Sequence, residues 1–294
     1  MANVPLPTLD DLWNGTAQAP LTINAVREVI DSVRPLCIVP RVIEKGTHFF
    51  RARRTKGNEP FSFFKDLTYR SDLKGIEMGR ANSPHHSVFY GSMSSAELKH
   101  ALLTVCMETS KLMRDRGIGH QTFTVGIWKV KKPFTILTLV PPKTLGVLAR
   151  DVGAYAATQQ QPQGMEADDR HRFDLFQRLI EREFRKRVRS DASSDSYTIS
   201  AAFSEFIYEK LGVGLAYPSV ETDGMGQNVA LLPHVVEECL KPAGAQFVQF
   251  HRSGEDESTL CQYKMAFGNY HPIRWIDMHP KYAVFREFIL DSEV

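Results

Sequence analysis

The side chains best suited to catalysis in this sequence are two glutamates, Glu97 and Glu108, which lie on one predicted helix. We expect Ser94 to open that helix. Along the helix, residues at helical spacing form an apolar stripe that consists of Leu98, Ala101, Leu102, Val105, Thr109 and Leu112. At about 100° per residue, Glu108 projects within roughly 20° of Ala101, on the flank of this stripe. A carboxylate in that position is expected to be half-buried.

The two glutamates differ in how well a structural role explains them. Ser94 and Glu97 have the spacing of a capping box, in which the acid bonds a free amide of the first turn and favours the positive end of the helix dipole. Glu97 therefore has a sufficient structural role. Glu108 has no such role, and a carboxylate at the edge of an apolar face indicates either a functional acid or a buried ion pair with Arg or Lys.

A polar loop and a short strand come directly before this helix. Gly79, Arg80 and Asn82 lie in a turn-prone segment that carries a cation, and residues 87–90 form a β-branched and aromatic run that ends in Tyr90. The loop, the strand and the helix together bring several polar groups into one stretch of chain. We expect the rest of the molecule to support it.

An earlier strand is predicted at 48–53. Alternation places Phe49 and Arg51 on one face of it and Phe50 and Ala52 on the other. An arginine that points the same way as a phenylalanine suits an anionic ligand. An edge strand with solvated arginines explains the pattern equally well.

Residues between two later strands also suit a binding site. The helix predicted at 197–211 leads through a short apolar strand to Ser219, which lies at the strand end. Gly224, Gly226 and Asn228 surround a tight loop before the next apolar strand, and glycine at such a place lets the backbone approach a ligand closely. Ser219 lacks the GxSxG context of an esterase nucleophile.

The other segments predict the scaffold. Residues 1–20 are a Pro-rich arm that we expect to be poorly ordered, and the polar, Gln-rich stretch 156–169 is expected to be a loop or insertion. Further helices are expected at 22–34, 172–188 and 282–290. Further strands are expected at 121–130, 134–140, 246–252, 262–267 and 273–278, of which the first two are predicted to form a hairpin or an irregularly connected pair.

Composition excludes several classes of protein. The 294 residues are 43% hydrophobic and 24% charged, which is typical of a globular chain, and a formal net charge of +2 does not argue for nucleic acid as a partner. The basic run at 182–189 is best explained as the solvated face of a helix. The four cysteines are scattered without CxxC spacing, so neither a zinc site nor a disulfide framework is expected.

The sequence also has no segment typical of export by a signal peptide or of membrane insertion. Acids and prolines occupy the N-terminus, and no apolar run approaches the length of a membrane-spanning helix. We therefore expect a cytoplasmic site of action, with no membrane partner and no metal.

Taken in order, these motifs resemble those of the RES-domain family, named for its arginine, glutamate and serine. The resemblance covers roughly residues 46–232 and lies in Phe50-Arg51-Ala52-Arg53, Gly79-Arg80-x-Asn82, Phe89-Tyr90 with the Glu108 helix, Tyr217-Pro218-Ser219 and Gly226-x-Asn228. Members of that family have a fold like that of ADP-ribosyltransferases. They commonly act as toxins that consume NAD+, often held in check by a co-expressed antitoxin.

The resemblance implies an α+β fold with mixed, mostly antiparallel sheets and flanking helices. It implies an N-terminal arm and docking helix at 1–45, followed by one ADP-ribosyltransferase-like catalytic domain at 46–294 with a polar insertion near 154–170. NAD+ would be the substrate rather than a cofactor. An antitoxin or immunity protein is the expected partner, and the oligomeric state stays open.

The resemblance also implies roles for individual residues. It makes Glu108, Arg80, Tyr90 and Ser219 catalytic, and Arg51, Asn82 and Asn228 substrate-binding. Glu108 would stabilise the oxocarbenium-like sugar that forms as nicotinamide leaves. Arg51 and Arg80 offer planar, permanently charged donors to the pyrophosphate. Tyr90 would contact the nicotinamide riboside end, Ser219 would orient the substrate or the glutamate, and Asn228 would place an amide at the pocket rim.

The sequence departs from the family pattern in two places. Residues 83–86 lack the glycine of the usual Pro-Pro-Gly-like turn, and Glu108 follows Tyr90 at a greater distance than usual. The extra separation is about two helical turns, or roughly 10 Å along a helix axis, so Glu97 stays a candidate for the active acid. Three functions remain open: an NAD+ glycohydrolase or phosphorylase, an ADP-ribosyltransferase that modifies a macromolecule, and a non-catalytic NAD-binding or interaction domain.

Overall fold

The structure is a computed structural model, which describes residues 5–33, 39–55, 57–94, 100–139, 166–188, 193–224, 226–254, 258–279 and 284–285. In this part of the chain, eleven strands form one mixed sheet, which confirms the predicted α+β class. The strand order is β1-β5-β6-β7-β3-β2-β4-β8-β9-β10, and β11 also pairs with β9. The β5–β6 pair is parallel, whereas the other pairs are antiparallel.

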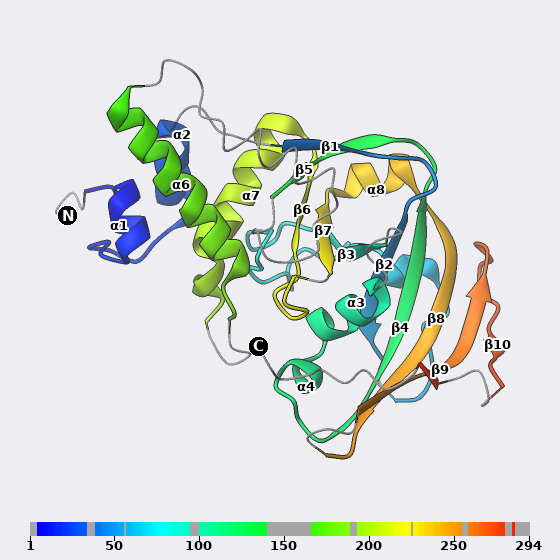
Figure 1. Ribbon diagram of the computed structural model, residues 1–294. Coiled ribbons are helices and arrows are strands. Elements are labelled where there is room, and N and C mark those ends of the chain that lie inside the picture. The colour runs from blue at the N-terminus through cyan, green and yellow to red at the C-terminus, as the bar shows by residue number, and fades with distance from the viewer. Residues whose placement is uncertain are drawn as a thin grey trace.

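The strands range from two to thirteen residues in length. They are β1 (Val39–Ile43), β2 (His48–Arg54), β3 (Phe89–Ser94), β4 (Gly119–Val130), β5 (Phe134–Thr138), β6 (Gly214–Pro218), β7 (Gln227–Leu231), β8 (Leu240–Arg252), β9 (Ser258–Phe267), β10 (Ile276–Asp277) and β11 (Val284–Phe285). The long strands β4 and β8 curve strongly, and α3 lies on the inner side of their curve, next to β2 (Figure 1).

Helices pack at one end of the sheet and in its hollow. The α-helices are α1 (Leu9–Asn14), α2 (Ile23–Ser32), α3 (Ala101–Thr109), α4 (Lys111–Arg114), α6 (Ala167–Arg185), α7 (Thr198–Leu211) and α8 (Pro233–Cys239), and the 3₁₀ helices are η1 (Phe64–Leu67) and η2 (Ser194–Tyr197). Helices α1, α2, α6 and α7 gather beside the end of the sheet that holds β5 and β6 (Figure 1). No helix in the described ranges has both the length and the apolar character needed to cross a membrane.

Side-chain alternation divides the buried residues between the two faces of the sheet. On β2, Phe49 packs in a cluster with Phe89 and Trp128, whereas Ala52 packs on the opposite face with the residues of α3. On β6, Leu215 faces α6 and α7, and Ala216 faces the first cluster. The alternation predicted for residues 48–53 is therefore confirmed, and α3 and the helices α6 and α7 cover the same face of the sheet.

The N-terminal segment contains one helix that the sequence indicated and one that it did not. Helix α2 lies within the predicted range 22–34 and packs on α7. The arm expected to be poorly ordered contains α1, which begins with a capping box between Thr8 and Asp11 and buries Leu9 and Leu12. The short-range capping bonds and the contact with α6 order this segment.

Several predicted elements are wrong for a common reason, namely that distant strands pair more favourably than neighbours in sequence. The predicted hairpin does not form, because β4 pairs with β2 and β8 while β5 pairs with β1 and β6. Ser94 does not open a helix but ends β3, opposite His48. Val284 and Phe285, expected in a final helix, pair with β9 instead.

Other boundaries shift by a few residues. Strand β8 starts at Leu240 rather than near 246. The strand expected at 273–278 is shorter than predicted and consists of the two residues of β10. Of the predicted polar insertion, residues 167–169 form the first turn of α6, and 154–165 lie outside the described residues. Glu97 also lies outside them.

Candidate active site

Glu108 is held by two side chains that come from distant parts of the sequence. Its Oε1 atom accepts hydrogen bonds from Ser219 Oγ and from Asn228 Nδ2, both at 2.7 Å. Its other carboxylate oxygen, Oε2, makes no hydrogen bond to a described residue. Glu108 is half-buried, as predicted. We call Glu108, Ser219 and Asn228 the glutamate cluster.

Helix α3 brings Glu108 to this position by a close contact one turn earlier. Thr104 is fully buried, and a Cβ atom placed on Gly226 would lie 2.1 Å from its Oγ1 atom. Only glycine fits there, so the loop before β7 lies directly against α3. Because residues four apart share one face of a helix, Glu108 points the same way as Thr104. The helix ends just beyond it, where Ser110 is extended and caps α4.

Ser219 and Asn228 are neighbours because their strands pair. Asn228 lies on β7, opposite Tyr217 of β6, and Ser219 directly follows β6. The loop between them is closed by hydrogen bonds from Ser219 N to Gly226 O and from Gly224 N to Ser219 O, both 2.8 Å long. This geometry fixes both donors toward the same carboxylate oxygen. Ser219 therefore orients Glu108.

Tyr90 and Asn82 bind to each other. The Tyr90 hydroxyl donates to Asn82 Oδ1 at 2.7 Å and accepts from Ala81 N at 2.8 Å. A Cβ atom on Gly79 would lie 2.9 Å from the Tyr90 hydroxyl, so the tight turn requires glycine. Burial raises the pKa of Tyr90 well above its ordinary value, and the phenol stays neutral.

Arg80 binds backbone carbonyls at the end of α6. Its Nη1 donates to the carbonyls of Glu183 (2.8 Å) and Phe184 (3.1 Å), and its Nη2 donates to that of Lys186 (2.9 Å). A cation at this place satisfies the unpaired carbonyls of a helix C-terminus and complements its dipole. Within the described residues, Arg80 Nε has no hydrogen bond, and its contact with the predicted pyrophosphate stays a prediction.

Arg51 lies on the opposite face of the sheet from α3. Its Nη1 donates to the Tyr90 carbonyl at 2.7 Å, and its guanidinium lies 5.4 Å from the centre of the Phe89 ring. Burial, reinforced by the nearby Arg53, lowers the pKa of Arg51 to about 10. Its buried Nε atom has no hydrogen-bond partner among the residues that the structure describes. Arg51 is thus a charged group with one donor unused, and it makes no contact with Glu108.

The strand order explains why the predicted residues gather. Ser219, Asn228, Tyr90 and Arg51 lie on or directly after β6, β7, β3 and β2, which are consecutive in the sheet. Helix α3 then adds Glu108 on the face to which Tyr90 and Asn228 point, whereas Arg51 points to the other face. The structure joins Glu108 directly to Ser219 and Asn228, and joins Tyr90 directly to Asn82 and Arg51.

Two residues near Glu108 were not singled out as site residues from the sequence. Arg114 on α4 donates from Nη1 to the Glu108 carbonyl at 3.0 Å, so it supplies a cation beside the site. Tyr217 is buried, and its pKa is raised first by burial and then by the neighbouring side chains of Tyr90 and Glu108. The position of Tyr217 directly before Pro218-Ser219 could have indicated from the sequence that it lies near the site. The position of Arg114 could not, because it depends on the end of α3 and the start of α4 at Ser110.

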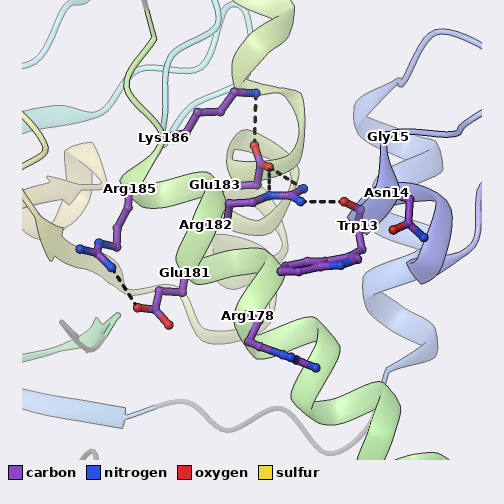
Figure 2. Close-up of a pocket in the computed structure, with 9 residues that line it drawn as sticks. All are labelled: Trp13, Asn14, Gly15, Arg178, Glu181, Arg182, Glu183, Arg185 and Lys186. Carbon is purple, nitrogen blue, oxygen red and sulfur yellow. Dashed lines mark hydrogen bonds and ion pairs between the residues drawn. The ribbon is translucent and has the colours of Figure 1, made fainter. Parts of the chain in front are cut away.

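A large cavity lies elsewhere, between α1 and α6. It has a volume of about 740 Å³ and is lined by Trp13, Asn14, Gly15, Arg178, Glu181, Arg182, Glu183, Arg185 and Lys186. Figure 2 shows the indole of Trp13 beside Arg178 and Arg182, with dashed lines from Arg182 to the Trp13 carbonyl and to Glu183. None of the predicted site residues lines this cavity.

The described residues contain no group of three or more His, Cys, Asp or Glu side chains that could hold a metal ion. Cys106, Cys239 and Cys261 are free thiols.

Comparison with known protein families identifies a domain in this chain. The RES domain matches residues 48–252, which is more than half of the chain and includes every predicted site residue. Helices α1 and α2 lie before the match. No curated protein matches the sequence. On the strength of the domain match, this chain belongs to the RES-domain family.

Proposed function

We propose that this protein cleaves the bond between nicotinamide and ribose in NAD+. The observation that carries the proposal is the glutamate cluster, in which two donors fix one oxygen of Glu108 and leave Oε2 without a partner among the described residues. Bond cleavage builds positive charge on the ribose ring, and a fixed carboxylate stabilises that charge without having to reorganise.

The surrounding groups suit the rest of the substrate. Arg114 is a cation beside the cluster, and it retains donors for an anionic group such as a pyrophosphate. Arg51 points to the other face of the sheet, and its predicted contact with NAD+ stays a prediction. Tyr90 is a neutral, partly buried phenol that offers aromatic surface to the nicotinamide end. In this proposal Ser219 and Asn228 are orienting groups, and NAD+ is consumed as a substrate.

Purified protein incubated with NAD+ tests the proposal directly. We expect nicotinamide release without any added protein acceptor, and we expect Glu108→Gln to abolish most of it. Release that requires a macromolecular acceptor would favour an ADP-ribosyltransferase. Binding of NAD+ with no release by the folded protein would favour a non-catalytic binding domain.

The biological role that follows is that of a toxin acting in the cytosol. Expression in bacteria should stop growth and lower NAD+ before membranes lose integrity, whereas the Glu108→Gln protein should be harmless. An antitoxin or immunity protein that covers the site would then protect the cell. Growth arrest at an unchanged NAD+ level would contradict this role.

A further inference from the structure

A second carboxylate, Glu221, lies beside the glutamate cluster. It follows Ser219 by two residues, so the two Cα atoms are at most about 7 Å apart. Ser219 itself is in hydrogen-bond contact with Glu108. Glu221 is half-buried and forms no hydrogen bond or ion pair with any described residue. A partly buried acid without a partner has no evident structural role.

The loop that carries Glu221 is shaped by other groups. Besides the backbone bonds that close it, Gly226 N donates to Thr222 Oγ1 at 3.0 Å, and Thr222 is buried. On its outer side Asp223 pairs with Arg187 at 2.7 Å. The loop therefore holds its form without help from Glu221, whose side chain is left available.

The charges that surround Glu221 come from four elements. Burial raises its pKa most, and the carboxylate of Glu108 on α3 raises it further. Arg114 on α4, Arg187 after α6 and Arg80 in the loop before β3 oppose this shift. These three arginines already bind other acceptors, namely the Glu108 carbonyl, Asp223 and the end of α6. Glu221 is thus a second acid in the same small region, two residues along the chain from the serine that binds Glu108.

We propose that the Glu221 carboxylate is the general base for the molecule that attacks the ribose, and that it makes this molecule water rather than phosphate. This inference rests on the proposed cleavage of NAD+. The bond between ribose C1′ and the nicotinamide nitrogen breaks, and its electron pair stays on nicotinamide. A water oxygen forms the new bond to C1′, its proton passes to the Glu221 carboxylate and then to solvent, and the products are nicotinamide, ADP-ribose and one proton.

Two physical effects favour water at such a site. A carboxylate accepts a proton from water as the new bond forms, which is general-base catalysis. Its negative charge repels phosphate, because like charges in a half-buried site are poorly screened. A site that contained Glu108 alone would lack the base and would have one negative charge fewer to repel phosphate.

The test measures products as well as rate. Wild type and Glu221→Gln are incubated with NAD+ with and without inorganic phosphate, and ADP-ribose is separated from phosphorylated ADP-ribose by chromatography. Wild type should form ADP-ribose in both buffers. Glu221→Gln should lose hydrolysis about 10²-fold or more, and the fall in rate at acidic pH should begin at a lower pH, because only protonation of Glu108 then causes it. The phosphorylated share of its product should rise.

Asp223→Asn is the matched control in the same loop. Asp223 is exposed with a positive φ of 48°, which asparagine tolerates well, so this variant should keep the wild-type rate and products. Glu221→Asp should restore part of the hydrolysis, and thermal unfolding should verify that each variant is folded.

The outcomes separate this inference from the proposed function. If wild type releases no nicotinamide, the proposed function fails and the role of Glu221 fails with it. If wild type cleaves NAD+ but Glu221→Gln keeps its rate, pH profile and products, only the role of Glu221 is overturned. Wild type that forms mainly phosphorylated ADP-ribose would overturn it in the same way.

Discussion

Two regions of this molecule gather charged side chains, and they use them differently. Between α1 and α6, Glu183 is buried and pairs with Arg182 at 2.9 Å and Lys186 at 3.7 Å, and Arg182 also donates to the Trp13 carbonyl. We call these four residues the α6 contact. In the glutamate cluster, two neutral donors hold one oxygen of Glu108, and the other oxygen stays open.

The two regions differ in how much of the charge of each carboxylate is left unpaired. The α6 contact borders a cavity of about 740 Å³, yet its acid is neutralised by two cations. A carboxylate paired in this way stabilises structure and has little capacity left for a substrate. Glu108 is oriented by neutral groups, so its negative charge is still available to a developing cation.

The same substitution in the two regions should therefore have opposite consequences. Glu108→Gln keeps size and removes charge, so NAD+ cleavage should fall by about 2.7–4 kcal/mol of transition-state stabilisation, or roughly 10²–10³-fold, while the melting temperature changes little. Nicotinamide release and thermal unfolding measure the two effects. Near-normal turnover of NAD+ would exclude Glu108 as the active acid and leave Glu97 as the candidate.

Glu183→Gln should instead lower stability and spare the chemistry. Charge-assisted hydrogen bonds to Arg182 and Lys186 are lost, and since both cations are partly exposed to solvent we expect a loss of about 2 kcal/mol in the free energy of unfolding. Urea denaturation measures this loss. The cleavage rate per folded molecule should match wild type, and a large rate loss in folded protein would break the comparison.

Arg80→Lys tests a residue that links the two regions. A lysine cannot span the three carbonyls that Arg80 binds at the end of α6, so stability should fall by about 1.5 kcal/mol. Arg185→Lys is the control, because its single, exposed pair with Glu181 should contribute almost nothing.

Arg80→Lys also tests the predicted pyrophosphate contact. Calorimetry with NAD+ on the Glu108→Gln background compares affinities without turnover. Weaker binding by the lysine variant would support the contact. Equal affinity in the two proteins would leave Arg80 as the cap of α6 only.

Tyr217→Phe should have the smallest effect, one confined to alkaline pH. The buried phenol keeps its proton above pH 10, where an unfolded tyrosine loses it, so the unfolded state binds fewer protons and stability falls as pH rises. Removing the phenol should reduce this slope by about 1 kcal/mol per pH unit. Unfolding free energies from pH 9 upward measure the slope, and identical slopes would show that the Tyr217 phenol does not stay protonated.

Local patterns in the sequence were sufficient for some parts of this structure. Alternation placed Phe49 and Ala52 on opposite faces of β2, and helical spacing placed Glu108 at the edge of an apolar stripe. Ser219 was correctly placed at a strand end. These features depend on residues within one element, whose periodicity is visible in the sequence.

Other features depend on pairings that no local pattern records. The partners of β4 and β5 are far from them in sequence, so the turn signal at 131–133 predicted the wrong pair. The acceptors of Arg80 are backbone carbonyls, which every residue has, so residue types could not indicate its attachment to α6. Glu221 had no motif to mark it, and only the folded loop reveals it as unpaired.

The glutamate cluster also has a consequence for the order of events during synthesis. Its hydrogen bonds connect residue 108 to residues 111 and 120 positions later in the chain. A ribosome-bound chain that stops before Asn228 lacks the strand that completes the cluster, however well its earlier segments have folded. A cell that makes this protein therefore has no assembled site on the growing chain until most of the chain has emerged from the ribosome.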